Sequence, residues 1–297
     1  MKKLTSSRLA SPLAIFTLVF TLLVILWGAY VRASGSGAGC GAHWPLCNGN
    51  VLPKSPGTKT FVEFFHRATS GLDLILVFLS AWITRSANPK GSLARKAAAA
   101  SVFFILTEAA VGAGLVLLRL VENDQSTLRA FALAIHLTNT FLLLAALSLQ
   151  VFWQRSDAKK IPWPDRLGWI SLAVTTFVGI TGAITALGDT LFPATEAHQS
   201  THFLIRLRII HPILAILGGT ALIAVARKRI LQARAGDVTT QTAIALIAGV
   251  LIQWAVGFVN VALLAPTALQ IIHLLLADSL WILAIRLAFF GKTNALR

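Results

Sequence analysis

Eight apolar runs of about 20 residues constrain the fold of this sequence more than any other feature. A helix needs about 20 consecutive apolar residues to cross the hydrocarbon core of a bilayer. The runs lie between charges or Gly and Pro clusters, at residues 12–31, 62–83, 96–118, 129–153, 167–187, 204–226, 239–264 and 268–290. With 56% hydrophobic and 12% charged residues, the chain has too little polar surface for a soluble domain. The sequence therefore predicts an all-α integral membrane protein with eight transmembrane helices.

The basic residues are unevenly shared between the two sides of the membrane. A net charge of +15 could suggest nucleic-acid binding, but such proteins gather their basic residues in one solvated patch, and here helices separate them. Most of the 26 Lys and Arg residues lie at the two termini and in the loops 84–96, 154–166 and 227–238. The positive-inside rule therefore predicts that both termini are cytoplasmic. The first run is too long for a cleavable signal peptide, so we expect it to stay as the first helix.

A weak internal repeat divides the chain into two halves, residues 1–155 and 156–297. An even number of helices in each half gives both halves the same orientation, so we expect a parallel repeat of two pseudo-symmetric four-helix bundles. The loop before the last helix is shortened by eight residues relative to its counterpart. Three polar positions align, namely His66 with His211, Glu108 with Gln253 and, after that adjustment, His136 with His273.

One histidine of each even-numbered helix lies at a similar depth, roughly 6–10 Å below the outer face at 1.5 Å per residue. The four are His66, His136, His211 and His273. A single intramembrane histidine is usually a packing residue, but four at matching depth favour a functional site that faces the bundle interior. Two histidines per half, without accompanying cysteines or carboxylates, suit axial ligation of one haem iron per half better than a zinc site.

Haem propionates need cations near the membrane interface, and arginine binds carboxylates through its forked guanidinium. Several arginines lie near the outer helix ends, against the charge bias of that side. An alternative is that some of them extend to lipid headgroups. The propionate-binding candidates are Arg32, Arg67, Arg129, Arg206 and Arg208.

The two halves differ at Glu63, which precedes His66 by three residues and so lies on the same helix face. Its counterpart in the second half is Arg208, which has the opposite charge. A carboxylate at the edge of a haem pocket can accept or relay a proton near neutral pH. The simpler alternative is an acidic residue that stabilises the first turn of its helix.

Cys40 and Cys47 both lie in the first outer loop, in the sequence CGAHWPLC. A disulfide is permitted on an oxidising side of the membrane, and the spacing differs from the C-x-x-C of zinc and thioredoxin sites. A zinc site that also uses His43 would need a fourth ligand, which the neighbouring sequence does not offer.

The whole chain resembles the haem A synthase family of bacterial membrane enzymes. The resemblance rests on eight helices in two halves, on the four histidines, and on the local motifs Gly28-Ala29-Tyr30-Val31-Arg32-Ala33-Ser34-Gly35, Cys40 with Cys47, and Glu63-x-x-His66-Arg67. One departure is that residues 187–202 lack the second cysteine pair that some members carry. That departure puts a second disulfide in doubt, but not the chemistry at Glu63.

The resemblance implies that the C8 methyl of haem O is oxidised by two hydroxylations to a gem-diol, which loses water to give the formyl group of haem A. It implies that His66 and His136 hold the substrate haem beside Glu63, that His211 and His273 hold haem b, and that Cys40 and Cys47 form a disulfide. It also implies a bacterial cell membrane, haem O synthase (protohaem farnesyltransferase) upstream and oxidase assembly factors downstream. The redox partner is not identified.

Two other functions are compatible with parts of the pattern. A bis-haem b-type electron carrier would perform no chemistry on the porphyrin and would be indifferent to loss of Glu63. A transporter with parallel repeats would use the midplane residues Glu108 and Gln253 and would be colourless. His198 and His202, in a polar outer loop, indicate either solvated surface or a lid.

Overall fold

The computed structural model describes residues 2–54, 57–154, 156, 158–192, 202–233 and 237–291. These contain eight α-helices: α1 (Lys2–Ala33), α2 (Thr58–Ala87), α3 (Leu93–Leu117), α4 (Thr127–Phe152), α5 (Arg166–Leu191), α6 (Phe203–Gln232), α7 (Val238–Ala262) and α8 (Thr267–Phe290). All eight are long and apolar enough to cross a membrane. The protein is therefore a multi-pass membrane protein, and the predicted all-α fold with eight transmembrane helices is confirmed.

Several helices extend beyond the apolar runs from which they were predicted. α1 begins at Lys2 rather than near residue 12, and α2 covers Thr58–Ala87 rather than 62–83. Hydropathy detects only the apolar part of a helix, whereas backbone hydrogen bonding continues through charged residues at its ends. Polar side chains cap other helices at their starts: Ser126 accepts a hydrogen bond from the Arg129 amide, and Asp165 from the Gly168 amide.

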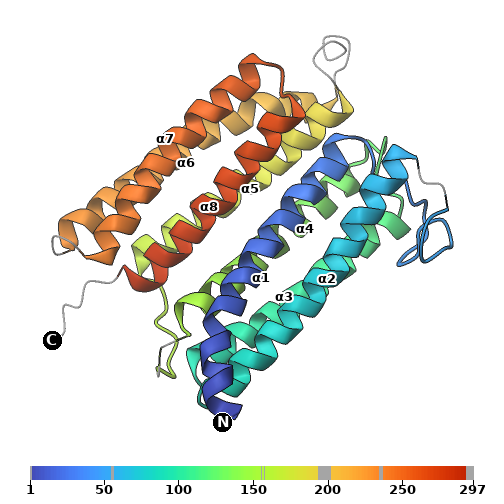
Figure 1. Ribbon diagram of the computed structural model, residues 1–297. Coiled ribbons are helices and arrows are strands. Elements are labelled where there is room, and N and C mark those ends of the chain that lie inside the picture. The colour runs from blue at the N-terminus through green and yellow to red at the C-terminus, as the bar shows by residue number, and fades with distance from the viewer. Residues whose placement is uncertain are drawn as a thin grey trace.

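The helices form two groups of four, which we call the N-terminal quartet (α1–α4) and the C-terminal quartet (α5–α8). In both quartets each helix contacts the next along the chain, and the first contacts the fourth. α1 and α4 also pack against α5 and α8, so these four helices lie between the outer pairs α2 with α3 and α6 with α7 (Figure 1). The exact domain boundary near residue 155 and a rotational relation between the halves stay predictions.

The interface between the quartets is centred on two stacked aromatic rings. The centroids of Phe141 in α4 and Trp281 in α8 lie 4.8 Å apart, with an interplanar angle of 14°. The Trp281 indole N–H donates a 2.7 Å hydrogen bond to the Phe141 carbonyl. Leu18 and Leu22 of α1 pack against this cluster. Because a bilayer offers no water to a buried indole N–H, the bond to a neighbouring helix fixes the ring orientation.

The start of α1 and the end of α8 lie at the same end of the bundle (Figure 1). The loop between α1 and α2 lies at the other end, which we call the disulfide end because that loop contains Cys40 and Cys47. Consecutive helices alternate in direction, so α2, α4, α6 and α8 all begin at the disulfide end. Side chains in the first turns of these four helices are thereby brought to one depth.

We predict that Trp281→Ala destabilises the association of the two quartets. Removing a buried tryptophan typically costs about 3–5 kcal/mol, because the cavity and the lost transfer energy add. Unfolding of the detergent-solubilised protein, followed by circular dichroism against denaturant, measures the change. Trp82→Ala is the matched control, since Trp82 on α2 is 68% exposed and faces away from the protein. An equal loss of stability in both variants would contradict the assigned role of Trp281.

Candidate functional site: paired histidines beside a carboxylate

The four predicted histidines lie on α2, α4, α6 and α8, near the disulfide end of the bundle. Each is between six and nine residues beyond the first residue of its helix. Because these four helices begin at the same end, the imidazoles lie at similar depths within the apolar part of the protein. The structure therefore places the four histidines near the same end of the bundle, and their role as haem ligands stays a prediction.

The four histidines are shared equally between the two quartets. His66 on α2 and His136 on α4 belong to the N-terminal quartet, and His211 on α6 and His273 on α8 belong to the C-terminal quartet. In the part of the chain that the structure describes, no cluster of three or more His, Cys, Asp or Glu residues could hold a metal ion. Structural and catalytic zinc sites use three or four protein ligands, whereas a haem iron can take two axial imidazoles. Two imidazoles per quartet therefore fit haem rather than zinc.

Three of the histidine rings lie directly against a glycine of a neighbouring helix. A Cβ atom on Gly28 would come within 2.9 Å of Cε1 of His66. At Gly182 and Gly257 the corresponding distances, to Cε1 of His211 and His273, are 3.0 Å. A side chain at Gly28 would therefore displace the imidazole, and one at Gly182 or Gly257 would require the ring to shift by a few tenths of an ångström. The glycines thus allow the rings to lie flush with the facing helix backbone.

The ring nitrogens differ in their partners. His66 Nδ1 and His273 Nδ1 are buried and have no hydrogen-bond partner, and neither does His136 Nδ1, although the Glu108 carboxylate lies beside it. A ligating histidine gives one ring nitrogen to the metal and the other to a second group. The remaining contacts are Thr181 Oγ1 with His211 Nδ1 at 3.1 Å, Gln253 Nε2 with His273 Nε2 at 3.2 Å, and Glu108 Oε1 with His136 Nδ1 at 3.2 Å.

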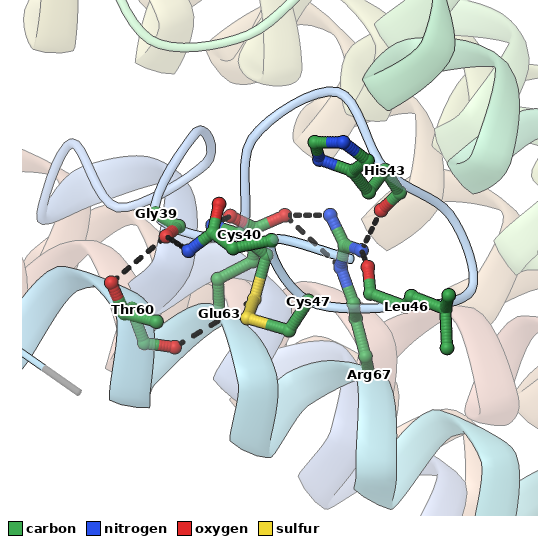
Figure 2. Close-up of polar contacts among 9 residues, drawn as sticks. Gly39, Cys40, His43, Leu46, Cys47, Thr60, Glu63 and Arg67 are labelled. Carbon is green, nitrogen blue, oxygen red and sulfur yellow. Dashed lines mark hydrogen bonds and ion pairs between the residues drawn. A yellow bond between two sulfur atoms is a disulfide. The ribbon is translucent and has the colours of Figure 1, made fainter. Parts of the chain in front are cut away.

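Glu63 is buried, with 3% of its surface exposed, and both carboxylate oxygens are engaged (Figure 2). Oε1 accepts from Nε of Arg67 at 3.1 Å and from its terminal nitrogen at 2.5 Å. Oε2 accepts a 2.8 Å hydrogen bond from the backbone amide of Cys40. The carboxylate therefore joins α2 to the loop that precedes it, one turn before His66. The carboxylate faces that loop, and its partners are the guanidinium of Arg67 and the backbone amide of Cys40.

Arg67 completes the attachment of the loop. Its third guanidinium nitrogen donates to the carbonyls of His43 and Leu46, the latter at 2.7 Å (Figure 2). One arginine thus bridges the Glu63 carboxylate and two loop carbonyls. Arginine suits this task because its planar fork can donate in several directions at once.

Cys40 and Cys47 are disulfide-bonded and almost fully buried, at 0% and 1% exposure. The predicted pairing is confirmed, and a zinc site that uses these thiols is excluded. The loop is packed directly on α2: Thr60 Oγ1 donates a 2.8 Å hydrogen bond to the Gly39 carbonyl. A Cβ on Gly39 would come within 2.4 Å of the Lys59 carbonyl oxygen, so only glycine permits this approach.

The other predicted propionate-binding arginines have varied surroundings. Arg206 is exposed. Arg129 donates to the carbonyls of Glu122 and Asp124, both at 2.8 Å. Arg208 forms a 2.7 Å ion pair with Asp189. A role in propionate binding stays a prediction for all five arginines.

Arg32 connects the two quartets at the disulfide end. From the end of α1 it donates to the Ala186 carbonyl at 2.6 Å and to Thr190 Oγ1 at 2.5 Å, both on α5. Its other terminal nitrogen donates to Gln270 Oε1 of α8 at 3.1 Å. These partners lie more than 150 residues away in the chain, and no sequence pattern indicated them.

Sequence reasoning also missed that Glu108 and Gln253 contact histidines. Both were treated as midplane polar residues, although their equivalence in the repeat was a usable signal. The predicted outer-loop residue His198 lies outside the described residues. His202 caps α6, where its Nδ1 accepts from the Leu204 amide at 3.4 Å, and it packs against Phe192 and Phe203.

Comparison with known proteins gives a consistent result. The sequence matches the COX15-CtaA family, described as cytochrome oxidase assembly protein, over residues 11–285. A protein named protoheme IX farnesyltransferase from Thermus thermophilus is 42% identical over 301 residues, which cover 97% of this chain and 49% of that protein. The heme A synthase of Staphylococcus carnosus is 34% identical over 58% of this chain and 56% of its own length. That of Alkalihalophilus pseudofirmus is 38% identical over 35% of each. The chain thus spans about half the length of the curated relatives it matches, or less.

We predict that Arg67→Ala exposes the buried disulfide to reductants. Removing the guanidinium frees two loop carbonyls and leaves the Glu63 carboxylate without its cation, so the loop should separate from α2 more often. The rate at which a water-soluble phosphine makes Cys40 and Cys47 reactive to a thiol label should rise relative to the parent protein. Lys54→Ala, which removes an exposed positive charge from the same loop, should leave that rate unchanged. Equal rates for Arg67→Ala and the parent would show that the ion pair does not hold the loop.

Proposed function

The chain belongs to the COX15-CtaA family of cytochrome oxidase assembly proteins, and we propose that it is an oxidoreductase that converts haem O to haem A. In this reaction the C8 methyl of haem O is hydroxylated twice, and the resulting gem-diol loses water to give a formyl group. Relatives named heme A synthase from several bacteria, at 31–42% identity, support the proposal.

The observation that carries the proposal is an asymmetry between two similar sets of histidines. Each quartet presents two imidazoles at the disulfide end, and in the N-terminal quartet a buried carboxylate, Glu63, lies one turn before a histidine. The aligned position in the C-terminal quartet is Arg208, which is paired with Asp189. An electron-transfer haem needs no acid or base beside the ring, whereas oxidation of a methyl group must dispose of protons. The asymmetry therefore supports a substrate site in the N-terminal half, residues 1–155.

In this proposal His66 and His136 hold the iron of the substrate haem between α2 and α4. The facing helices supply apolar walls that exclude water, and Gly28 keeps the His66 ring close to α1. The predicted arginines at the outer helix ends, chiefly Arg67, Arg129 and Arg32, would neutralise the propionates. Those that already bind protein carbonyls would have to share or exchange these contacts.

Glu63 would accept a proton, or stabilise developing positive charge, as hydrogen is removed from the methyl group. Its two oxygens are held by Arg67 and by the Cys40 amide, so the carboxylate is fixed in position before any substrate arrives. A carboxylate fixed in this way can act in a water-poor site without reorganisation, which is the condition for effective electrostatic stabilisation. Access of a proton to Glu63 would depend on the loop that Arg67 holds in place.

We further propose that the C-terminal half, residues 156–297, holds haem b between His211 and His273. A bound haem b supplies one-electron redox chemistry. Thr181 contacts Nδ1 of His211 and Gln253 contacts Nε2 of His273, and Arg206 and Arg208 are the predicted partners for the propionates in this half. The protein would lie in a bacterial cell membrane with both termini in the cytoplasm and both haem sites toward the outer face.

The place of this reaction in haem metabolism follows from its substrate. The Thermus relative is named protoheme IX farnesyltransferase. It aligns with 97% of this chain and is about twice as long. That name supports the proposal that a farnesyltransferase acting on protohaem supplies haem O. Oxidase assembly factors would then receive haem A.

We predict that Glu63→Gln stops the reaction while both haems remain bound. The amide keeps the size of the side chain and can still accept from the Cys40 amide, but it carries no charge and is a poor base. General acid–base groups typically contribute about 10²–10⁴ in rate. Haem O, or its hydroxylated alcohol, should therefore accumulate in cells that depend on this protein, as measured by chromatography of extracted haems.

The matched control for this prediction is Glu122→Gln. Glu122 lies in an outer loop, is paired with Lys59 at 3.6 Å and has 41% of its side chain exposed. The Glu122→Gln variant should leave haem A output unchanged. Normal haem A output from a well-expressed Glu63→Gln protein would instead favour a bis-haem electron carrier.

We predict that His211→Ala or His273→Ala removes haem b from the C-terminal quartet and halves the haem-to-protein ratio. Each imidazole supplies one axial bond, and the apolar helices can insert without a cofactor. The absorption spectrum and a pyridine haemochrome assay measure the loss. His43→Ala should leave the ratio intact, since the His43 side chain is exposed in the first loop. An unchanged low-spin spectrum in His211→Ala would refute the ligand assignment.

A further inference from the structure

We propose that Glu108 of α3 is a positioning residue of the substrate haem site. By contacting Nδ1 of His136 it fixes the ring with Nε2 available to iron, and it makes His136 the strongest axial ligand of the four histidines. As a result the haem in the N-terminal quartet has a lower reduction potential than a neutral partner would give. The inference rests on the proposed function, because it takes His136 as a haem ligand.

The contact with His136 involves a carboxylate that is itself held by α4. Glu108 Oε1 lies 3.2 Å from His136 Nδ1, although the ring is not aligned for a full hydrogen bond. Thr140 Oγ1 donates to the same oxygen, and Asn139 Nδ2 donates to Oε2 at 2.6 Å. The histidine and both donors thus come from consecutive turns of one helix, so the carboxylate is placed relative to the ligand it supports.

Asn139 is fixed in turn by α3. Its amide nitrogen also donates to the Phe104 carbonyl at 2.9 Å, and its oxygen accepts from Thr107 Oγ1 at 2.6 Å. The Glu108 side chain is only 17% exposed. A charge buried in an apolar bundle is tolerated when hydrogen bonds replace its hydration, and donors to an ionised acceptor bind strongly. The surroundings of Glu108 are therefore built for an ionised carboxylate.

The C-terminal quartet differs at all three equivalent positions. The repeat places Gln253, Leu276 and Ala277 where the first quartet has Glu108, Asn139 and Thr140. Gln253 Nε2 lies 3.2 Å from His273 Nε2 and donates to the His273 carbonyl at 3.1 Å, while its Oε1 is buried without a partner. The carboxylate and both of its donors are thus replaced together by neutral or apolar groups, which indicates that the charge beside His136 is specific to the first quartet.

A carboxylate on the distal nitrogen of a ligating histidine has a known physical effect. It fixes the tautomer and orientation of the ring and raises its basicity as a ligand, and loss of such a partner typically costs about 10–100-fold in metal affinity. A more basic ligand favours the ferric over the ferrous iron and so lowers the reduction potential. In the described part of the C-terminal quartet, the partners of the imidazole nitrogens are the Thr181 hydroxyl at His211 Nδ1 and the Gln253 amide at His273 Nε2, both neutral.

The test is a redox titration of the full-length protein, purified in detergent with its haems and followed by absorption and by electron paramagnetic resonance of the ferric state. In Glu108→Gln, the potential of one haem should rise and its ferric signal should shift, while the other haem is unchanged. Release of that haem to apomyoglobin should be about 10–100-fold faster. Glu122→Gln should move neither potential.

A matched transplant tests the same interaction in the second quartet. Gln253→Glu alone lacks donors for the new charge, so it should have little effect. The triple variant Gln253→Glu with Leu276→Asn and Ala277→Thr should lower the reduction potential of the haem in the C-terminal quartet. A haem-replete Glu108→Gln protein or a haem-replete transplant with unmoved potentials would overturn the inference. If Glu108→Gln releases its haem too quickly to titrate, the reduction potential of the transplant variant provides the test. Loss of both haems from both variants would indicate general destabilisation and would also overturn it.

These outcomes are distinct from failure of the proposed function. A parent protein that is purified without haem, or that yields no haem A, would refute the proposed function itself. A parent protein that makes haem A, combined with unmoved potentials in the variants, would refute only the role of Glu108.

Discussion

The absence of water from the hydrocarbon core is the constraint on which the rest of this structure depends, because each polar group placed there must find its partner within the protein. At the end opposite the disulfide, Gln150 donates to Ser80 and Thr84, each at 2.9 Å, and the buried guanidinium of Arg229 pairs with Asp165. At the disulfide end, Glu63 pairs with Arg67. Both ends therefore use charged partners from within the protein, and the charges of the disulfide end are those that lie near the four histidines.

The contacts at the disulfide end also make one rigid unit of elements that are distant in sequence. Glu63 binds Arg67 and the Cys40 amide, so the first loop, the disulfide and the turn that precedes His66 move together. Arg32 then binds α5 and α8, which ties the end of α1 to the C-terminal quartet. In the proposed function, a reaction on one haem and electron transfer to a second haem would require a fixed relative placement of the two quartets, to which these arginines would contribute.

Much of the fold follows from the sequence because hydropathy is a strong signal for helices in membranes. The limits of α2 were misjudged by several residues, since charged helix ends carry no such signal. At the site, the spacing of Glu63 and Arg67 permits an ion pair one turn apart, but the bonds of Arg67 to two carbonyls of the first loop were not predicted, because an irregular loop leaves no sequence pattern. The bonds of Arg32 to α5 and α8 depend on how the quartets pack, which no local pattern encodes.

The structure also changes the meaning of the charge difference between the halves. In the sequence Glu63 aligns with Arg208, which suggests a reversal of charge between the two sites. In the structure Glu63 is paired with Arg67 and Arg208 with Asp189, so each pair is close to neutral and the reversal largely cancels. Glu108 is different, because in the described chain its partners are two neutral donors and the imidazole of His136. A neutral pair beside a haem changes its potential little, whereas an uncompensated carboxylate on its ligand changes it directly. The electrostatic difference between two otherwise similar histidine pairs therefore rests on Glu108 more than on the residue where the sequence first revealed it.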